Sequence, residues 1–214
     1  MSNRRLPTPA EVCHVSLQQP GLPAPGVPLS PGVPGGPPVS VGAAAEFEHQ
    51  LLCAAAEAAR SAGFHAQFIT SRVQGEAREI AKVVAGSAID ISQSGRPLPR
   101  PGCAIFGGET TVTVTGAGRG GRSQELAVAA AQLLAGVPRV AVLAMATDGT
   151  DGPTDACGGL VDGSTIERAR VRGGDVVRAL KANDTYAYLE MSEDLIITGP
   201  TGTNVNDLYM AFAW

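Results

Sequence analysis

The sequence has few aromatic side chains and few charges, and it contains no long apolar run. Aromatic residues make up 4% and charged residues 17% of the 214 residues, and the formal net charge is -4. This mild balance argues against a nucleic-acid partner, because binding to a phosphate backbone needs Lys and Arg clustered on one face. No apolar run of about 18 residues and no secretory signal pattern are found. We therefore expect a cytoplasmic protein with neither nucleic acid nor membrane as a partner.

Cysteine is also scarce. The four cysteines, Cys13, Cys53, Cys103 and Cys157, are scattered, with no CxxC pair and no histidine cluster near them. Zinc sites and disulfide frameworks show closer and more regular spacing. The sequence therefore predicts free thiols.

Proline is concentrated near the N-terminus. Residues 1–43 hold most of the prolines, and Gln19 to Pro38 shows no apolar periodicity. Such a segment cannot bury enough surface to offset its chain entropy, so we predict a disordered Pro/Gly-rich tail or linker. A polyproline ligand for an SH3 or WW domain is the weaker alternative, because no basic residue flanks its PxxP-like spacings.

Residues 44–214 have the pattern of one α/β domain. Helical periodicity over 44–62 and 75–92 encloses a short extended segment at 64–70, and Gly-rich turns separate the later segments. The fold class predicted from this alternation is a layered sandwich of helices packed on a mixed β-sheet. Further strands are expected at 103–106, 110–115, 139–146, 195–198 and 208–212, with helices at 123–134, 164–170 and within 175–189. A Gly107-Gly108 pair is expected to join the first two of these strands.

The first glycine-rich loop, residues 116–125, lies between a predicted strand and a predicted helix. Backbone N–H groups and a helix N-terminus converge on an anion at such a junction, and glycine permits close ligand approach. Arginine adds a planar fork that matches phosphate or carboxylate oxygens. The residues concerned are Gly118, Arg119, Gly120, Gly121 and Arg122. We predict an anion site here; the alternative is a flexible turn with two solvated arginines.

The same loop also satisfies the GxGxxG spacing of dinucleotide-binding folds, at Gly116, Gly118 and Gly121. Those folds open on an apolar parallel strand and place an acidic residue after the next strand. Here the preceding strand alternates with threonine, and residues 139–146 contain no carboxylate. The dinucleotide interpretation is therefore disfavoured.

The second loop, residues 147–155, follows the most apolar strand. Ligands of open α/β sheets gather beyond the carboxyl ends of strands, so Asp148 and Asp151 are candidate Mg²⁺ ligands. Turn and cap chemistry, in which an aspartate bonds nearby backbone, is an equal alternative.

The third loop, residues 198–207, joins two predicted strands and is rich in hydroxyls, amides and glycines. Its backbone N–H groups could accept an anion with help from neighbouring side chains. A hairpin loop that satisfies its own backbone is the alternative. The candidate ligand-binding residues are Thr201, Gly202, Thr203 and Asn204.

Taken together, four blocks resemble the MOFRL domain of glycerate 2-kinases. They are Gly-Gly-Glu-Thr-Thr-Val-Thr-Val at 107–114, Gly-Arg-Gly-Gly-Arg-Ser-Gln-Glu at 118–125, Thr-Asp-Gly-Thr-Asp-Gly-Pro-Thr-Asp-Ala at 147–156 and Thr-Gly-Pro-Thr-Gly-Thr-Asn-Val-Asn-Asp at 198–207. Asn-Asp-Thr-Tyr at 183–186 resembles a fifth block. The order and spacing of the blocks match, and the resemblance extends from about Phe47 to Phe212.

The resemblance implies transfer of a phosphoryl group from ATP to the 2-hydroxyl of D-glycerate, with Mg²⁺, in a cleft between this domain and an N-terminal Rossmann-like domain. It assigns the family's catalytic arginine to the first loop, giving Arg122 first and Arg119 second. Glu109 becomes a further candidate for substrate or phosphate contact. Residue 123 is serine where the family usually has asparagine, which we interpret as a change of helix-capping group.

The larger departure from the family's pattern concerns the N-terminal domain, because residues 1–46 are too few to form a fold of that size. We expect a half-site that needs this domain in cis or in trans. The alternatives are a non-catalytic anion-binding module, a truncated fragment, or an NAD(P)-dependent hydroxypyruvate reductase, a name that some family members carry. Assembly into a homo-oligomer is a further alternative.

Overall fold

The computed structural model describes residues 41–214 of the chain. Along this part the elements are α2 (Val41–Ser61), β1 (His65–Glu76), α3 (Ala77–Ser94), β2 (Gly102–Thr111), α4 (Arg122–Leu134), β3 (Val140–Ala146), β4 (Gly158–Asp162), α5 (Thr165–Val171), α6 (Val176–Ala182), α7 (Thr185–Ser192), β5 (Leu195–Ile196) and β6 (Asp207–Ala213). The predicted tail, residues 1–43, lies outside the described residues except for its last three, which already belong to α2.

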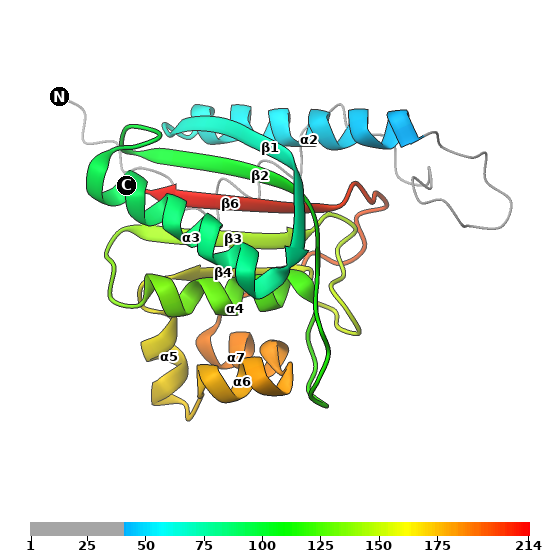
Figure 1. Ribbon diagram of the computed structural model, residues 1–214, viewed down its shortest axis with the longest axis vertical. Coiled ribbons are helices and arrows are strands. Elements are labelled where there is room, and N and C mark those ends of the chain that lie inside the picture. The colour runs from blue at the N-terminus through cyan, green and yellow to red at the C-terminus, as the bar shows by residue number, and fades with distance from the viewer. Residues whose placement is uncertain (1–40) are drawn as a thin grey trace, which may run out of the picture.

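The strands form one mixed six-stranded sheet in the order β1-β2-β6-β3-β4-β5. Only β1 and β2 run parallel, and every other neighbouring pair is antiparallel. Helices α3 and α4 cover one face, α2 packs along β1 and β2 on the other, and α5–α7 gather beyond α4 (Figure 1). This architecture confirms the predicted sandwich of helices on a mixed sheet.

Strand β3 shows why the core forms at the centre of this sheet. Each of its seven residues is buried. Val140, Val142 and Ala144 pack in the cluster beneath α3 and α4, while Leu143 and Met145 pack in the cluster on the α2 face. A strand that is covered on both faces has a continuous run of apolar residues, because neither of its two alternating sets of side chains is exposed to water. This run is the reason that β3 could be predicted from the sequence.

Several boundaries differ from the sequence-based expectation. Strand β1 continues to Glu76, and β4 was not predicted, because its glycine-rich sequence lacks a strand pattern. The helical region predicted within 175–189 is split at Asn183, whose left-handed backbone (φ 53°) ends α6 before α7 begins. Asparagine tolerates this conformation better than most residues, so it can end a helix much as glycine does.

The Gly107-Gly108 pair was predicted to join two strands. It lies instead inside the single strand β2. A Cβ atom at Gly107 would come within 2.6 Å of Leu52 in α2. Gly108 has a φ of 139°, and a Cβ there would lie 2.2 Å from the carbonyl oxygen of Val73 in β1. The pairing of β1 with β2 shifts register between Thr70 and Val73. The two glycines therefore allow α2 and the irregular strand β1 to approach β2 closely.

We predict that Gly108→Ala lowers the free energy of unfolding by at least about 2 kcal/mol, because the backbone is strained and the new methyl group overlaps β1. Gly86→Ala is the matched control. Gly86 lies inside α3, and no atom lies within 4 Å of the place that an added methyl group would take, so this change should raise stability by about 0.5–1 kcal/mol. Urea unfolding measures the stability of both variants. Equal effects of the two substitutions would contradict the role of Gly108 in the close approach of β1 to β2.

Candidate functional site

The second and third loops meet at one end of the sheet, where β3 ends and β6 begins (Figure 1). The hydroxyl of Thr201 donates to the carbonyl of Thr147 at 2.6 Å, and the amide of Thr201 donates to the carbonyl of Asp148 at 3.1 Å. Thr147 in turn donates from its hydroxyl to the carbonyl of Asn206 at 2.7 Å. These contacts fix the two loops against each other.

The amino end of α4 is fixed to the second loop by Asp151. Its two carboxylate oxygens accept the amides of Ser123 at 3.2 Å and Gln124 at 2.8 Å, and Asp151 is only 2% exposed. The anion at this helix N-terminus is therefore a side chain of the protein itself. Of the two roles considered for Asp151, the structure supports the cap rather than the Mg²⁺ ligand. Residue 123 is inside α4, so the expectation that its hydroxyl caps the helix was wrong.

The two predicted Mg²⁺ ligands, Asp148 and Asp151, both accept hydrogen bonds from backbone amides. Asp148 accepts the amide of Thr150 on Oδ1 at 3.0 Å, which is the turn chemistry considered as its alternative. Within residues 41–214, no group of three or more His, Cys, Asp or Glu side chains is arranged to hold a metal ion. Because Mg²⁺ is commonly bound through only one or two carboxylates together with substrate phosphates, the assignment of Asp148 and Asp151 as its ligands stays a prediction.

Arg122 projects from the first turn of α4 onto Asp207, the first residue of β6. Its Nε donates to Oδ2 at 2.7 Å and its Nη2 donates to Oδ1 at 3.0 Å. Asp207 is fully buried, while the Arg122 side chain is 31% exposed. Its Nη1 lies 3.3 Å from Oε1 of the exposed Glu109. Burial opposes the charge of Arg122, but the hydrogen bond and charge of Asp207 outweigh it and raise the pKa of the guanidinium.

Asp207 was missed by sequence reasoning. Tyr209 donates its hydroxyl to Oδ2 of Asp207 at 2.9 Å, and the Tyr209 hydroxyl lies 3.1 Å from the hydroxyl of Thr110. The available signal was the aspartate that closes the block at 198–207 and starts an apolar strand. A carboxylate at the start of a buried strand needs a cationic or polar partner, because its burial is otherwise costly.

Arg119 lies apart from Arg122. Its guanidinium sits 4.9 Å from the centre of the Tyr186 ring, and the Tyr186 hydroxyl donates to Asp155 at 2.8 Å. The stacking is a cation–π contact. Within residues 41–214 the Arg119 side chain makes no hydrogen bond or ion pair, so its donors are open to a ligand.

The glycines of the first loop serve the fold rather than an open anion nest. None of Gly118, Gly120 and Gly121 has a positive φ. A Cβ at these positions would meet Asp184 at 2.4 Å, Thr185 at 2.1 Å and Asp151 at 2.3 Å, respectively. The close approach that glycine permits is to the protein itself. The predicted phosphate-binding role of these glycines stays a proposal.

The first loop is held at its other end by Asn183. Its Oδ1 accepts the amides of Thr115 at 2.8 Å and Gly116 at 2.9 Å, and its Nδ2 donates to Glu125 at 3.0 Å. Glu125 is 1% exposed and is neutralised by Arg78, whose Nη2 lies 2.6 Å away. This polar cluster gives the Asn183 block a structural role that the sequence did not reveal.

The third loop largely satisfies its own polar groups. The amide of Thr203 donates to the Thr201 hydroxyl at 3.3 Å, and the amide of Asn206 donates to Oδ1 of Asn204 at 3.3 Å. Gly202 takes a positive φ of 75°. These contacts agree with a loop that satisfies its own backbone, but the expectation of a hairpin was wrong, because β3 and β4 lie between β6 and β5 in the sheet. Gly202 and Asn204 are exposed and accessible to a ligand.

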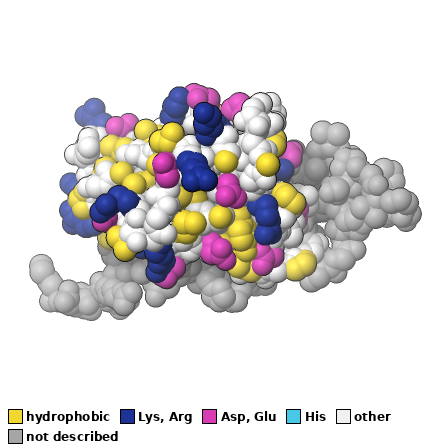
Figure 2. All heavy atoms as spheres, turned by 90° about the horizontal axis from the view of Figure 1, so that it is seen from below, with side chains coloured by type: hydrophobic (Ala, Val, Ile, Leu, Met, Phe, Trp, Pro, Cys, Tyr) yellow, Lys and Arg dark blue, Asp and Glu magenta, His cyan; other side chains and the backbone are white. Residues whose placement is uncertain are grey.

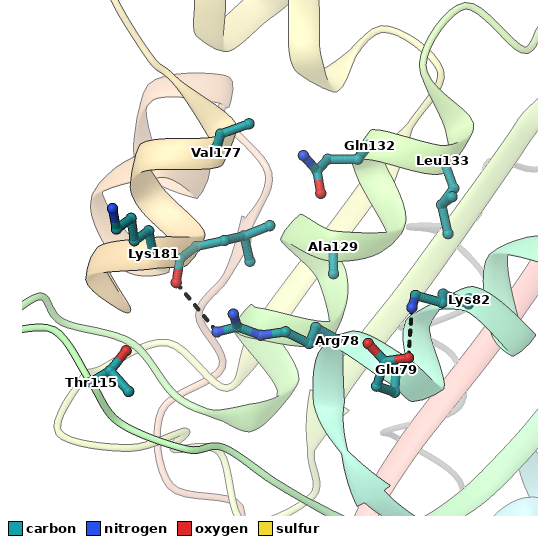
Figure 3. A pocket seen from close by; sticks show the side chains of 10 residues that line it. Arg78, Glu79, Lys82, Thr115, Ala129, Gln132, Leu133, Val177 and Lys181 are labelled. Atoms are coloured by element: carbon teal, nitrogen blue, oxygen red, sulfur yellow. Dashed lines mark hydrogen bonds and ion pairs between the residues drawn. The ribbon is translucent and has the colours of Figure 1, made fainter.

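A groove of about 410 Å³ lies between α3, α4 and α6 and is bordered by Thr115, just before the first loop (Figure 3). Apolar side chains such as Leu133 and Val177 line it, and Arg78 crosses its floor toward the carbonyl of Leu180 at 3.3 Å. None of the predicted site residues lines this groove. We therefore place the candidate site at the loops and not in the groove.

The molecular surface shows no large field of one sign on the face that carries α5–α7, where acidic and basic side chains are interspersed (Figure 2). In the described part of the chain, no helix combines the length and apolarity that a membrane crossing requires.

The comparisons with known proteins agree with the sequence blocks. Residues 102–207 match the MOFRL family, and this part of the chain belongs to that family. A D-glycerate 2-kinase from Thermotoga maritima is 49% identical over 74% of the chain and 38% of its own length. The crystal structure of a glycerate kinase from the same organism superposes with a TM-score of 0.76 at 46% identity, covering 78% of this chain and 40% of that one.

A relative from Agrobacterium vitis with hydroxypyruvate reductase in its name is 40% identical over 73% of the chain and 36% of its own length. The chain thus spans about two fifths of the length of these relatives. Its sheet has one parallel pair, β1 with β2, whereas a dinucleotide-binding fold is built on a mostly parallel, doubly wound sheet. The described residues therefore do not form a dinucleotide-binding fold of that kind.

The Asp151 cap predicts a distinctive pH dependence. Burial raises the pKa of Asp151 from 3.8 to about 6, against the lowering effect of the Gln124 and Ser123 amides. The folded state therefore holds this proton more tightly than the unfolded chain does. The resulting stabilisation is present below about pH 4 and is lost as the pH rises through 6.

We predict that Asp151→Asn, which keeps one acceptor oxygen but cannot ionise, removes this decline. The free energy of unfolding of the wild type should fall between pH 4 and pH 7 by roughly 2–3 kcal/mol more than that of the variant. Urea titrations of both proteins across this range measure the difference. Parallel curves would contradict the raised pKa.

Proposed function

We propose that this chain is the C-terminal part of an ATP-dependent glycerate 2-kinase, which transfers the γ-phosphoryl group of ATP to the 2-hydroxyl of D-glycerate and forms 2-phosphoglycerate. The remaining part of the site is supplied by an N-terminal domain, in cis or in trans. The observation that carries the proposal is the anchored guanidinium of Arg122, whose second edge faces only the exposed carboxylate of Glu109 among the described residues.

Phosphoryl transfer asks mainly for positioned reactants and for cations that neutralise charge on the transferring group. Arg122 is suited to this because its orientation is fixed before any ligand arrives. Among residues 41–214, its Nη1 is paired only with Glu109, a side chain that is 57% exposed. A carboxylate or phosphate oxygen can replace Glu109 at this nitrogen. Arg119, which is stacked on Tyr186, is the second cation on the same loop.

The other candidates are assigned supporting roles. Glu109 would give way to the anion or contact a substrate hydroxyl, and the exposed Gly202 and Asn204 would contact the substrate from the third loop. Thr201 and Thr203 would hold that loop in place. ATP is the phosphoryl donor, and Mg²⁺ would accompany its phosphates rather than sit in a site built by this chain.

A non-catalytic anion-binding module is the second candidate function. It is favoured by the same geometry, because an arginine fixed within this chain needs no second domain to bind an anion. The two candidates differ in whether product forms when the missing part of the site is added.

We predict that the chain alone forms no 2-phosphoglycerate from D-glycerate and MgATP, and that product appears when the N-terminal domain of the Thermotoga maritima relative is added. A coupled assay measures product, and size-exclusion chromatography establishes whether the two pieces associate. The full-length relative is the positive control. Associated pieces that yield no product, with an active control, would contradict the kinase proposal and favour the binding module.

We also predict that Arg122→Ala weakens binding of 2-phosphoglycerate to the chain by about 1.5–3 kcal/mol, the value of a charge-assisted hydrogen bond. Arg170→Ala is the control. Arg170 pairs with Glu167 on the exposed surface of α5, and the change should leave binding unaltered. Isothermal titration calorimetry compares the proteins after circular dichroism confirms their folding. Equal affinity of the wild type and Arg122→Ala would remove Arg122 from the site.

A further inference from the structure

We propose that Asp207 is a positioning residue: its buried carboxylate sets the plane of the Arg122 guanidinium so that Nη1 points to the bound anionic group. This inference rests on the proposed function, since it concerns how the same site holds its substrate. Neither the family match nor the names of the relatives assign a role to Asp207.

The contact geometry fixes the guanidinium plane. A single hydrogen bond would let the group rotate about the donor, whereas two parallel bonds from Nε and Nη2 to the two carboxylate oxygens define its orientation. Their lengths are 2.7 Å and 3.0 Å. The edge that carries Nη1 is left for a ligand. Lysine could not reproduce this arrangement, because its ammonium has no planar fork.

Asp207 is itself held from behind. It begins β6, the strand between β2 and β3, and its backbone lies opposite Gly108 on one side and Ala146 on the other. The Tyr209 hydroxyl donates to its Oδ2, and Thr110 contacts the same hydroxyl. These contacts connect Thr110 and Tyr209 in the middle of the sheet, through Asp207, to the guanidinium of Arg122. Movement of the guanidinium away from Asp207 would break both hydrogen bonds and leave a buried carboxylate without its cationic partner.

The partners on the two edges of the Arg122 guanidinium differ in how far they are buried. Asp207 is fully buried, while Glu109 is 57% exposed and lies 3.3 Å from Nη1. An exposed ion pair contributes little free energy, so the Glu109 contact is easily exchanged for a ligand oxygen. A buried pair contributes little net stability relative to apolar packing, yet its rupture leaves an uncompensated charge. The buried pair therefore favours a role in orientation over one in stability.

The Arg168 and Asp194 pair supplies a matched control. Asp194 is a nearly buried aspartate that binds an arginine, Arg168, which is exposed to a similar extent as Arg122. This pair connects α5 with the start of β5 and has no contact with the three loops. Asp194→Asn should therefore disturb a comparable ion pair without affecting the anion site.

The test compares Asp207→Asn, Tyr209→Phe and Asp194→Asn with the wild type. We expect Asp207→Asn to weaken 2-phosphoglycerate binding by about tenfold, the cost of one misaligned charge-assisted hydrogen bond. Tyr209→Phe should weaken it less, and Asp194→Asn should bind as the wild type does. Melting temperatures of all four proteins establish how far each change acts through stability alone.

A second measurement needs no ligand. In NMR spectra of arginine side chains, the Nε–H of Arg122, assigned by its loss in Arg122→Lys, should exchange slowly in the wild type and rapidly in Asp207→Asn. If the wild type shows the protected signal but does not bind 2-phosphoglycerate, the proposed function fails while the Asp207–Arg122 arrangement stands. If Asp207→Asn keeps the protected signal and the wild-type affinity, the positioning role is overturned. Equal weakening by Asp194→Asn would overturn it as well, because the effect would then be one of general stability.

Discussion

The hydrogen bonds between Asp151 and the first amides of α4 are the contact on which the arrangement of the loops depends. They fix the amino end of this helix to the loop after β3. Arg122 lies on the first turn of the same helix, so its reach to Asp207 follows from that placement. The second and third loops are joined separately through Thr147 and Thr201. Three segments far apart in sequence thereby become one rigid edge of the sheet.

Burial of charged side chains at this edge of the sheet costs free energy, and each buried charge has specific partners. Asp151 and Asp207 are both buried, and each is compensated by donors from the first loop or α4. Glu125, further along α4, is compensated by Arg78 and Asn183. Burial of a carboxylate is tolerated only when its oxygens are hydrogen-bonded, so each aspartate restricts the loop that serves it. The edge is consequently preorganised rather than flexible, in contrast to the expectation for loops rich in glycine.

The sequence predicted the elements whose pattern is set by burial alone. Strand β3 and helix α4 were placed nearly to the residue, because one is apolar throughout and the other is rich in alanine. The positions of the three loops after strands followed from this. What the pattern could not show is the partner of each polar residue. Gly121 is small because Asp151 lies against it, and nothing near position 121 in the sequence reveals a contact 30 residues away.

The same limit applies to the roles of the aspartates. Asp148, Asp151 and Asp207 look alike in the sequence, since each lies in or beside a glycine-rich loop. Tertiary contacts make one a turn residue, one a helix cap and one the partner of an arginine. Local chemistry correctly indicated a polar, anion-related edge, but the distinction among these roles depends on which backbone amide or guanidinium the fold brings to each carboxylate.

The carboxylates at this edge differ in how far their hydrogen bonds are already satisfied. Transfer of a phosphoryl group to a hydroxyl needs a group that orients the hydroxyl or accepts its proton, in addition to cations that bind the phosphoryl oxygens. Around Arg122, Asp151 and Asp207 are already engaged by donors of this chain, and Glu109 faces the arginine. A third buried carboxylate, Glu48 of α2, accepts Nδ2 of Asn206 on Oε2 at 3.2 Å, while its Oε1 has no hydrogen-bond partner among the described residues. Burial raises the pKa of Glu48, so its surroundings hold this carboxyl less firmly in the charged form than water holds an exposed glutamate.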